Sequence, residues 1–263
     1  MSVPRRPPAL LAAPLLVLAL LLTGCSLGAA PAKAPAGVPG LGAAGPESGD
    51  ASVRGASPSP EPTPSPAGIP GLGPKTQARI PAETRQVFVV TGEAADSNQS
   101  SAVLYHRETP AKGWQPVAGP WPAHNGMEGW TDHHVAGDLK SPAGVYPLTD
   151  AGGRLPDPGA LLPYDEHPRF AVDGEGFFGE PLEGSFDYVV AINYNRTAGV
   201  SPLDRTRPLG LERGGGIWVH VDHGGPTQGC VSIPEARMEE LLRTLDPAMH
   251  PVIVMGDAER LGR

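Results

Sequence analysis

The chain has 263 residues, a formal net charge of −8, 33 prolines, 35 glycines and only two cysteines. An acidic chain lacks the positive footprint of a DNA- or RNA-binding protein, so we expect no nucleic-acid partner. An anionic substrate would have to be held by local positive groups, because the overall field repels it.

The first 24 residues have the form of a secretory leader. Two arginines precede an apolar run over residues 9–22, which is too short for a comfortable membrane span of about 20 residues. The run ends in LTGC at positions 22–25, a segment similar to the bacterial lipobox. We therefore expect 1–24 to be a lipoprotein signal peptide and Cys25 to be lipidated, which places the protein outside the cytoplasm, anchored to a membrane and facing the cell wall. A plain signal peptide with an incidental cysteine is the alternative.

Residues 25–74 are rich in Pro, Ala, Gly and Ser, with SPSPEPTPSP at 57–66 as the extreme. Such a composition buries too little apolar surface to order itself and predicts a disordered tether. Fully extended, it would reach on the order of 150 Å at about 3.1 Å per residue. The segment GVPGLG at 37–42 recurs as GIPGLG at 68–73, which leads into the folded part.

The remaining residues, 75–263, have the size of a single domain. Short runs rich in β-branched and aromatic residues predict strands there. The predicted strands are Gln86–Gly92, Ala102–Arg107, Phe186–Asn195, Gly216–Asp222 and Pro251–Asp257. Gly- and Pro-rich segments such as KSPAGVYPLTDAGG (140–153) are predicted to be connections.

One helix is predicted, over PEARMEELLRTLD (234–246). Proline lies in its first turn, Glu235 lies near the positive end of its dipole, and four apolar residues recur at helical spacing. Those four, expected to pack in the core, are Met238, Leu241, Leu242 and Leu245. Many short strands with one helix predict a mainly-β fold.

Cys230 has no intramolecular partner if Cys25 carries lipid. Structural cysteines in exported proteins usually occur in pairs, and a lone thiol outside the cell is open to oxidation. Its presence is easier to explain if the thiol reacts with a substrate. The alternative is a buried, inert cysteine that acts as a small hydrophobic residue.

The residues before Cys230 supply what a thiol nucleophile needs. Alternation along the strand at 217–221 puts Trp218 and His220 on one face, and a Gly-Gly-Pro turn then brings Cys230 back beside them. His220 is the predicted base. The successive amides of Gly229 and Cys230 are a predicted oxyanion hole, and a helix beginning at 232–234 would favour the thiolate.

Other interpretations of the histidines are weaker. His223 lies at the turn and is expected to share no face with His220, so it is the second choice as base. A zinc site would take its ligands from His220, His223, Asp222 and the pair His133–His134. However, His-x-x-His on a strand directs its two imidazoles to opposite faces. We therefore expect no metal and no cofactor. The pair 133–134 is expected at the rim of a groove, and Asp138 and Lys140 are expected to stabilise a turn.

The segment GIWVHVDHGGPTQGCVSIP (216–234) resembles the catalytic signature of the YkuD-type L,D-transpeptidases, a histidine followed by Ser/Thr-x-Gly-Cys. The segments WPAHNGMEGW, AGDLKSPAGVYPLTDAGG and INYNR (192–196) are similar to the actinobacterial lipoprotein branch of that family. The resemblance covers residues 80–257. It implies a YkuD-like β-sandwich or mixed sheet with one or few short helices.

The resemblance also implies cysteine acyl transfer on peptidoglycan stem peptides, with Cys230 as nucleophile and His220 as general base. The acyl-enzyme would be resolved by an amine, giving a cross-link, or by water, as in an L,D-carboxypeptidase. Thr227 would order the loop, the Gly229 backbone would bind the oxyanion, and carbapenem-type β-lactams would be covalent inhibitors. A wall-binding lipoprotein with a degenerate site is the alternative from another functional class.

The chain departs from the family pattern at two positions. Gln228 stands where histidine is common, and Ser232 stands where arginine or asparagine would help to hold the donor stem. Arg196 and Arg213, which flank the histidine strand, are candidate substitutes as carboxylate clamps. Tyr194 is expected either to contact substrate or to pair within the sheet, and His223 completes the candidate substrate-binding set.

Overall fold

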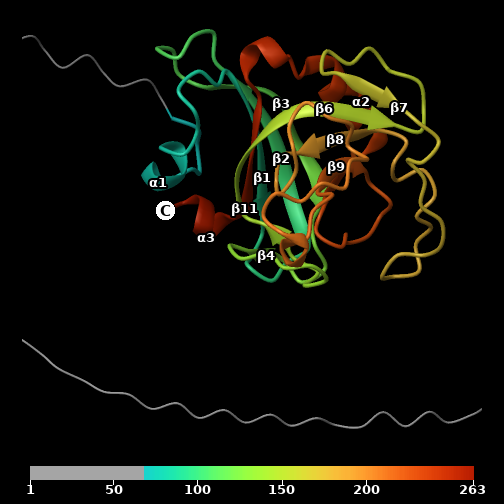
Figure 1. Cartoon of the computed structure of the whole chain (residues 1–263). Helices are drawn as coiled ribbons and strands as arrows, with labels where there is room; N and C mark the ends of the chain where they lie inside the picture. The colour runs from blue at the N-terminus through green and yellow to red at the C-terminus, as the bar shows by residue number, and fades with distance from the viewer. Residues whose placement is uncertain (1–67) are drawn as a thin grey trace, which may run out of the picture. The chain divides into compact units, whose positions relative to one another are not determined.

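The computed structural model describes residues 68–263 (Figure 1). The expected signal peptide, the lipidated Cys25 and the tether up to residue 67 lie outside the described residues. Within 68–263, no helix is long and apolar enough to span a bilayer.

The described part is mainly β with a few short helices, as predicted. Its strands are β1 (Gln86–Gly92), β2 (Gln99–His106), β3 (Gln115–His124), β4 (Trp130–Thr131), β5 (Ser141–Pro142), β6 (Gly144–Gly153), β7 (Tyr164–Glu166), β8 (Val189–Ile192), β9 (Trp218–Val221), β10 (Val231–Ile233) and β11 (Val252–Asp257). Its helices are α1 (Pro74–Gln77), α2 (Glu235–Thr244) and α3 (Ala258–Leu261), with 3₁₀ turns η1 (Leu211–Arg213) and η2 (Pro247–Met249).

Nine strands form one mixed sheet in the order β11-β1-β2-β3-β10-β9-β8-β6-β7. Strand β11 also pairs with β6, so eight strands close into a ring and β7 extends it beside β6. The pairs β1–β11, β9–β10 and β6–β7 are parallel, and the other pairs in this sheet are antiparallel. The expected mixed sheet is thus observed as one sheet closed on itself, not as two stacked sheets.

Apolar residues are buried on both faces of this sheet. On β1, Phe88 and Val90 join the larger core, while Val87 and Val89 join a second cluster on the other face. The larger core includes the helical stripe predicted from spacing, Met238, Leu241, Leu242 and Leu245, all fully buried. Helix α2 therefore covers this core, although it begins one residue after Pro234, which is its N-cap.

The folded part begins earlier than residue 75. Ile69 and Leu72 are buried in the second cluster, and the amides of Gly73 and Lys75 donate to the carbonyls of Leu261 and Arg263. Figure 1 shows α1 beside α3 accordingly. The second GxPGLG copy is therefore part of the domain, because its two bulky apolar residues find a buried surface to pack against.

Six observed strands have no predicted counterpart: β3, β4, β5, β6, β7 and β10. Two of them, β6 and β3, consist of residues that are poor strand formers. Strand β6 lies in the segment predicted to be a connection. Its last two residues are glycines that pack directly against backbone. A Cβ at Gly152 would lie 2.6 Å from the Asp165 carbonyl oxygen, and one at Gly153 would lie 2.1 Å from that of Asp187. Strand β3 contains three prolines, which lack a backbone N–H. Its pairing with β10 is confined to His124 and Ser232, so most of its residues need no backbone N–H donor on that edge.

Candidate active site

A cavity of about 580 Å³ brings together the two residues singled out in the sequence, Cys230 and His220. Four segments line it: the loop at 134–139, the long loop at 172–186, the glycine run that leads into β9, and the segment from β9 to β10. Two further histidines, His134 and His223, face the same space.

The Cys230 thiol is held by backbone groups. Its Sγ accepts the Trp218 amide at 3.4 Å, and its S–H donates to the Gly216 carbonyl at 3.6 Å. Desolvation raises the pKa of the thiol to about 11. The hydrogen bond from the Trp218 amide lowers the pKa, but by less than desolvation raises it. The resting thiol is therefore neutral at physiological pH.

The His220 ring is oriented by the next residue along the chain. Nδ1 lies 2.8 Å from the Val221 carbonyl, which can only accept, so Nδ1 carries the proton and the lone pair is on Nε2. Phe186 meets the ring edge-on at 5.3 Å. Desolvation lowers the pKa of His220 to about 4, so the imidazole is neutral and available as a proton acceptor.

Strand register sets the separation of nucleophile and base. In the parallel pair β9–β10, Val231 lies opposite Val219 and Ser232 opposite His220. Cys230 therefore precedes the residue opposite His220 by two positions and shares its face of the sheet. Spacings of about 3.3 Å per residue and 4.8 Å between strands put the two Cα atoms on the order of 8 Å apart. The thiol must rotate away from Gly216 to meet Nε2.

Thr227 orders the turn before Cys230, as expected. Its hydroxyl donates to the Cys230 carbonyl at 2.7 Å and accepts the Gly229 amide at 3.1 Å. In this conformation the Gly229 amide is bonded to the Thr227 hydroxyl, so it can fill its predicted oxyanion role only if that bond is released. The Cys230 amide remains as a candidate oxyanion donor.

The predicted effect of a helix dipole on the thiol is also not borne out. Strand β10 separates Cys230 from α2, which begins only at Glu235. The neighbours that bond the sulfur are the Trp218 and Gly216 backbone groups, not the end of a helix.

The prediction that His223 shares no face with His220 is wrong. The two rings stack at 5.8 Å with an interplanar angle of 9°. Strand β9 ends at Val221 and the chain turns at Gly224, with φ of 86°, so strand alternation no longer applies. On its other side, His223 Nδ1 lies 3.2 Å from Glu180 Oε1 of the long loop.

Ser232 is fully buried and does not line the cavity. Its hydroxyl donates to Asp222 at 2.8 Å, and the same carboxylate oxygen lies 2.8 Å from His124 Nδ1. The bond to Asp222 raises the pKa of His124. This network ties β3 to β10, and its histidine was missed because β3 was not recognised as a strand.

The two candidate clamps do not line the cavity. Arg196 is buried and pairs with Asp150 at 2.8 Å, so its charge is already neutralised within the fold. Arg213 lies in η1, and its carbonyl accepts the Tyr194 hydroxyl at 2.9 Å. Tyr194 is buried and joins loops, which favours its structural role over substrate contact. Gln228 is exposed and does line the cavity.

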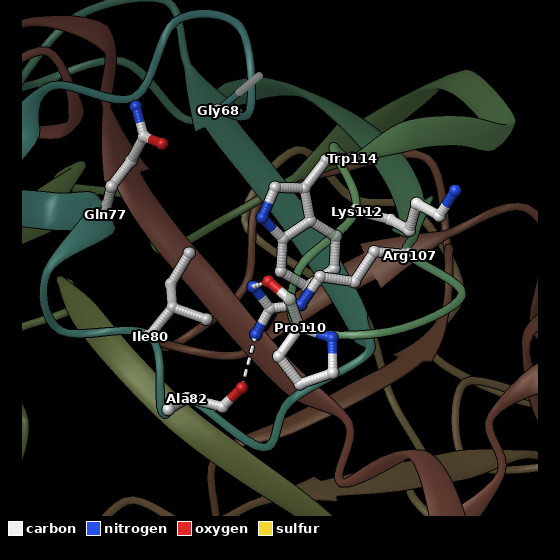
Figure 2. A pocket seen from close by; sticks show the side chains of 8 residues that line it. All are labelled: Gly68, Gln77, Ile80, Ala82, Arg107, Pro110, Lys112 and Trp114. Carbon is white, nitrogen blue, oxygen red and sulfur yellow. Dashed lines mark hydrogen bonds between the residues drawn. The ribbon is translucent and has the colours of Figure 1, made fainter. Parts of the chain in front are cut away.

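A second hollow, of about 240 Å³, lies between α1 and the β2–β3 connection (Figure 2). There the Arg107 guanidinium lies 4.4 Å from the Trp114 ring centroid and donates to the carbonyls of Thr84 and Ala82, both at 2.7 Å. These bonds are internal to the fold, and no Cys, His, Ser, Thr, Asp or Glu side chain lines the hollow. It is a structural feature.

Among the described residues, no group of three or more His, Cys, Asp or Glu side chains is arranged to hold a metal ion. No family model, no curated protein and no solved structure matches the chain.

Proposed function

We propose that the protein is a cysteine acyltransferase that acts on peptidoglycan stem peptides, an L,D-transpeptidase of the YkuD type. The observation that carries the proposal is the cavity shared by Cys230 and a neutral His220 whose Nδ1 is directed at the Val221 carbonyl. The resemblance of residues 216–234 to the family signature supports the choice of substrate.

In the first half of the reaction, the Cys230 sulfur attacks the carbonyl carbon of the third stem residue. The thiol proton passes to His220 Nε2 as the C–S bond forms. The C–N bond to the terminal D-alanine then breaks, and the proton goes from His220 to the leaving amine. The product is a thioester on Cys230 and free D-alanine.

The two groups begin as a neutral pair, because burial raises the pKa of the thiol and lowers that of the imidazole. This favours proton transfer during attack over a preformed thiolate–imidazolium pair. Substrate must also displace the thiol from the Gly216 carbonyl. Thr227 holds the turn so that the Cys230 amide can meet the developing oxyanion.

In the second half, an amine or water attacks the thioester carbon, the C–S bond breaks, and the thiol regains a proton. An amine acceptor forms a cross-link, whereas water makes the enzyme an L,D-carboxypeptidase. Gln228, exposed at the cavity, is the candidate residue for binding the stem peptide.

The setting proposed for this reaction is the cell wall, reached from a membrane through lipidated Cys25 and the tether. The Cys25→Ala variant should move from the membrane fraction to the soluble fraction after cell lysis. Unchanged retention in the membrane fraction would contradict the proposed lipid anchor.

Covalent trapping with a carbapenem tests the proposed function. Intact mass spectrometry of the treated protein should show one added inhibitor mass, absent from Cys230→Ala. His220→Gln should form the same adduct at a rate lower by about 10²-fold or more, the usual contribution of a general base. A protein that forms no adduct but binds isolated cell walls would favour the wall-binding alternative.

A further inference from the structure

The proposed reaction needs a proton acceptor twice, once for the Cys230 thiol and once for the incoming amine or water. His220 is placed for the first transfer. A second histidine, His134, lines the same cavity from the loop between β4 and β5. The first half of the reaction does not use it.

The His134 ring is held on several sides. It is only 4% exposed, and Tyr194 meets it edge-on at 5.4 Å. The Tyr194 hydroxyl also approaches the His134 carbonyl at 3.3 Å, which fixes the backbone beneath the ring. A side chain so confined is preorganised and loses little rotamer entropy when it acts on a substrate.

A carboxylate lies beside this ring. Asp138 Oδ1 is 2.9 Å from His134 Nδ1, although the Nδ1–H direction departs from that of an ideal hydrogen bond. The carboxylate is itself fixed, since its oxygens accept the amides of Val135 at 3.0 Å and Lys140 at 2.9 Å. Placing the ring proton on Nδ1 beside the carboxylate leaves the lone pair on Nε2.

The other edge of the ring faces glycine backbone beside the nucleophile. A Cβ at Gly229 would lie 3.5 Å from His134 Cε1, and a Cβ at Gly214 would lie 2.6 Å from Nε2. Glycine at 214 therefore leaves room for the Nε2 edge of the ring, which any larger residue would crowd. No hydrogen bond occupies Nε2 among the described residues. The His134 ring thus lies beside Gly229, the residue that precedes Cys230. His220 lies on another side of the cavity, where it packs on Phe186 and His223.

We infer that His134, supported by Asp138, is the acid–base residue of the second half-reaction, and this rests on the proposed function. As the acceptor nitrogen bonds to the thioester carbon, its proton passes to His134 Nε2. The C–S bond breaks, and the Cys230 thiolate recovers a proton from the imidazolium. His220 serves acylation and His134 serves deacylation, so each half-reaction has its own histidine.

The test separates the two halves in the full-length protein, with a tetrapeptide muropeptide as substrate. The first-turnover burst of D-alanine reports acylation, and steady-state release reports deacylation. His134→Gln should keep the burst rate within about twofold of wild type while steady-state turnover falls by about 10²-fold or more. The Cys230 thioester should then accumulate and be visible by mass spectrometry.

His133→Gln is the matched control, because His133 is adjacent in sequence but exposed and outside the cavity. It should turn over at the wild-type rate. His134→Ala should regain turnover on addition of imidazole, which a purely structural role would not produce. Equal losses of burst and turnover in both His134 variants, without rescue, would overturn the inference and leave the proposed function intact. The absence of any D-alanine release by wild type, in the first turnover or at steady state, would overturn both.

Discussion

Alkylation of Cys230 as a function of pH tests whether the thiol and imidazole rest as a neutral pair. With Cys25→Ser, Cys230 is the only thiol in the chain. Its pKa of about 11 makes it thiolate in about 0.03% of molecules at pH 7.5, against about 10% for a free cysteine of pKa about 8.5. Thiolate fraction alone should therefore slow alkylation on the order of 300-fold relative to free cysteine at that pH.

The assay follows iodoacetamide incorporation by mass spectrometry between pH 5 and pH 10, starting from folded protein at each pH. The rate should rise about tenfold per pH unit throughout, without a plateau, as expected of a thiol below its pKa. His220→Gln should give nearly the same profile, because a neutral imidazole stabilises no thiolate. A pH-independent plateau between about 5 and 8 that disappears in His220→Gln would refute the reasoning, since a thiolate–imidazolium pair produces that profile.

Three further predictions concern residues around the cavity. Because the pKa of His220 is lowered from 6.5 to about 4, its contribution to folding is complete above pH 6.5 and is lost as pH falls through 4. Wild type should therefore lose about 3 kcal/mol more than His220→Gln between pH 7 and below pH 4 in denaturant titrations. Arg196→Leu strands the buried Asp150 carboxylate and should lower the free energy of unfolding by about 3–5 kcal/mol. A change in substrate KM with unchanged stability would instead restore Arg196 as a clamp. Thr227→Val should lower stability by about 2 kcal/mol and slow acylation, whereas Thr227→Ser should retain both; equal behaviour of the two variants would contradict the hydroxyl's role.

Local sequence patterns predict an element correctly where its residue types favour the secondary structure that it adopts. Strand β1 was predicted at its observed bounds, and the apolar spacing of α2 identified its buried face. The predicted strand at 186–195 is observed only as Val189–Ile192, because flanking polar residues continue the pattern but not the pairing. Closure of the ring, through pairing of β11 with β6, depends on contacts between distant segments and has no local signal.

The shared position of the motif residues was predicted better than the contacts around them. The motif around Cys230 and His220 is local, so its members were found together. The stacking of His223 depends on where β9 ends, and the engagement of the Gly229 amide depends on a side-chain rotamer, so neither follows from residue types. Local sequence gives no sign that Arg196 is paired, because its partner, Asp150, lies 46 residues earlier in the chain.

Release of D-alanine from a tetrapeptide muropeptide tests the central claim most directly. Wild type should release D-alanine and form a transient thioester of the tripeptide on Cys230, and Cys230→Ala should do neither. His220→Gln should form the thioester about 10²-fold or more slowly. D-Alanine release that persists in Cys230→Ala, or a wild-type protein that releases none, would contradict the account.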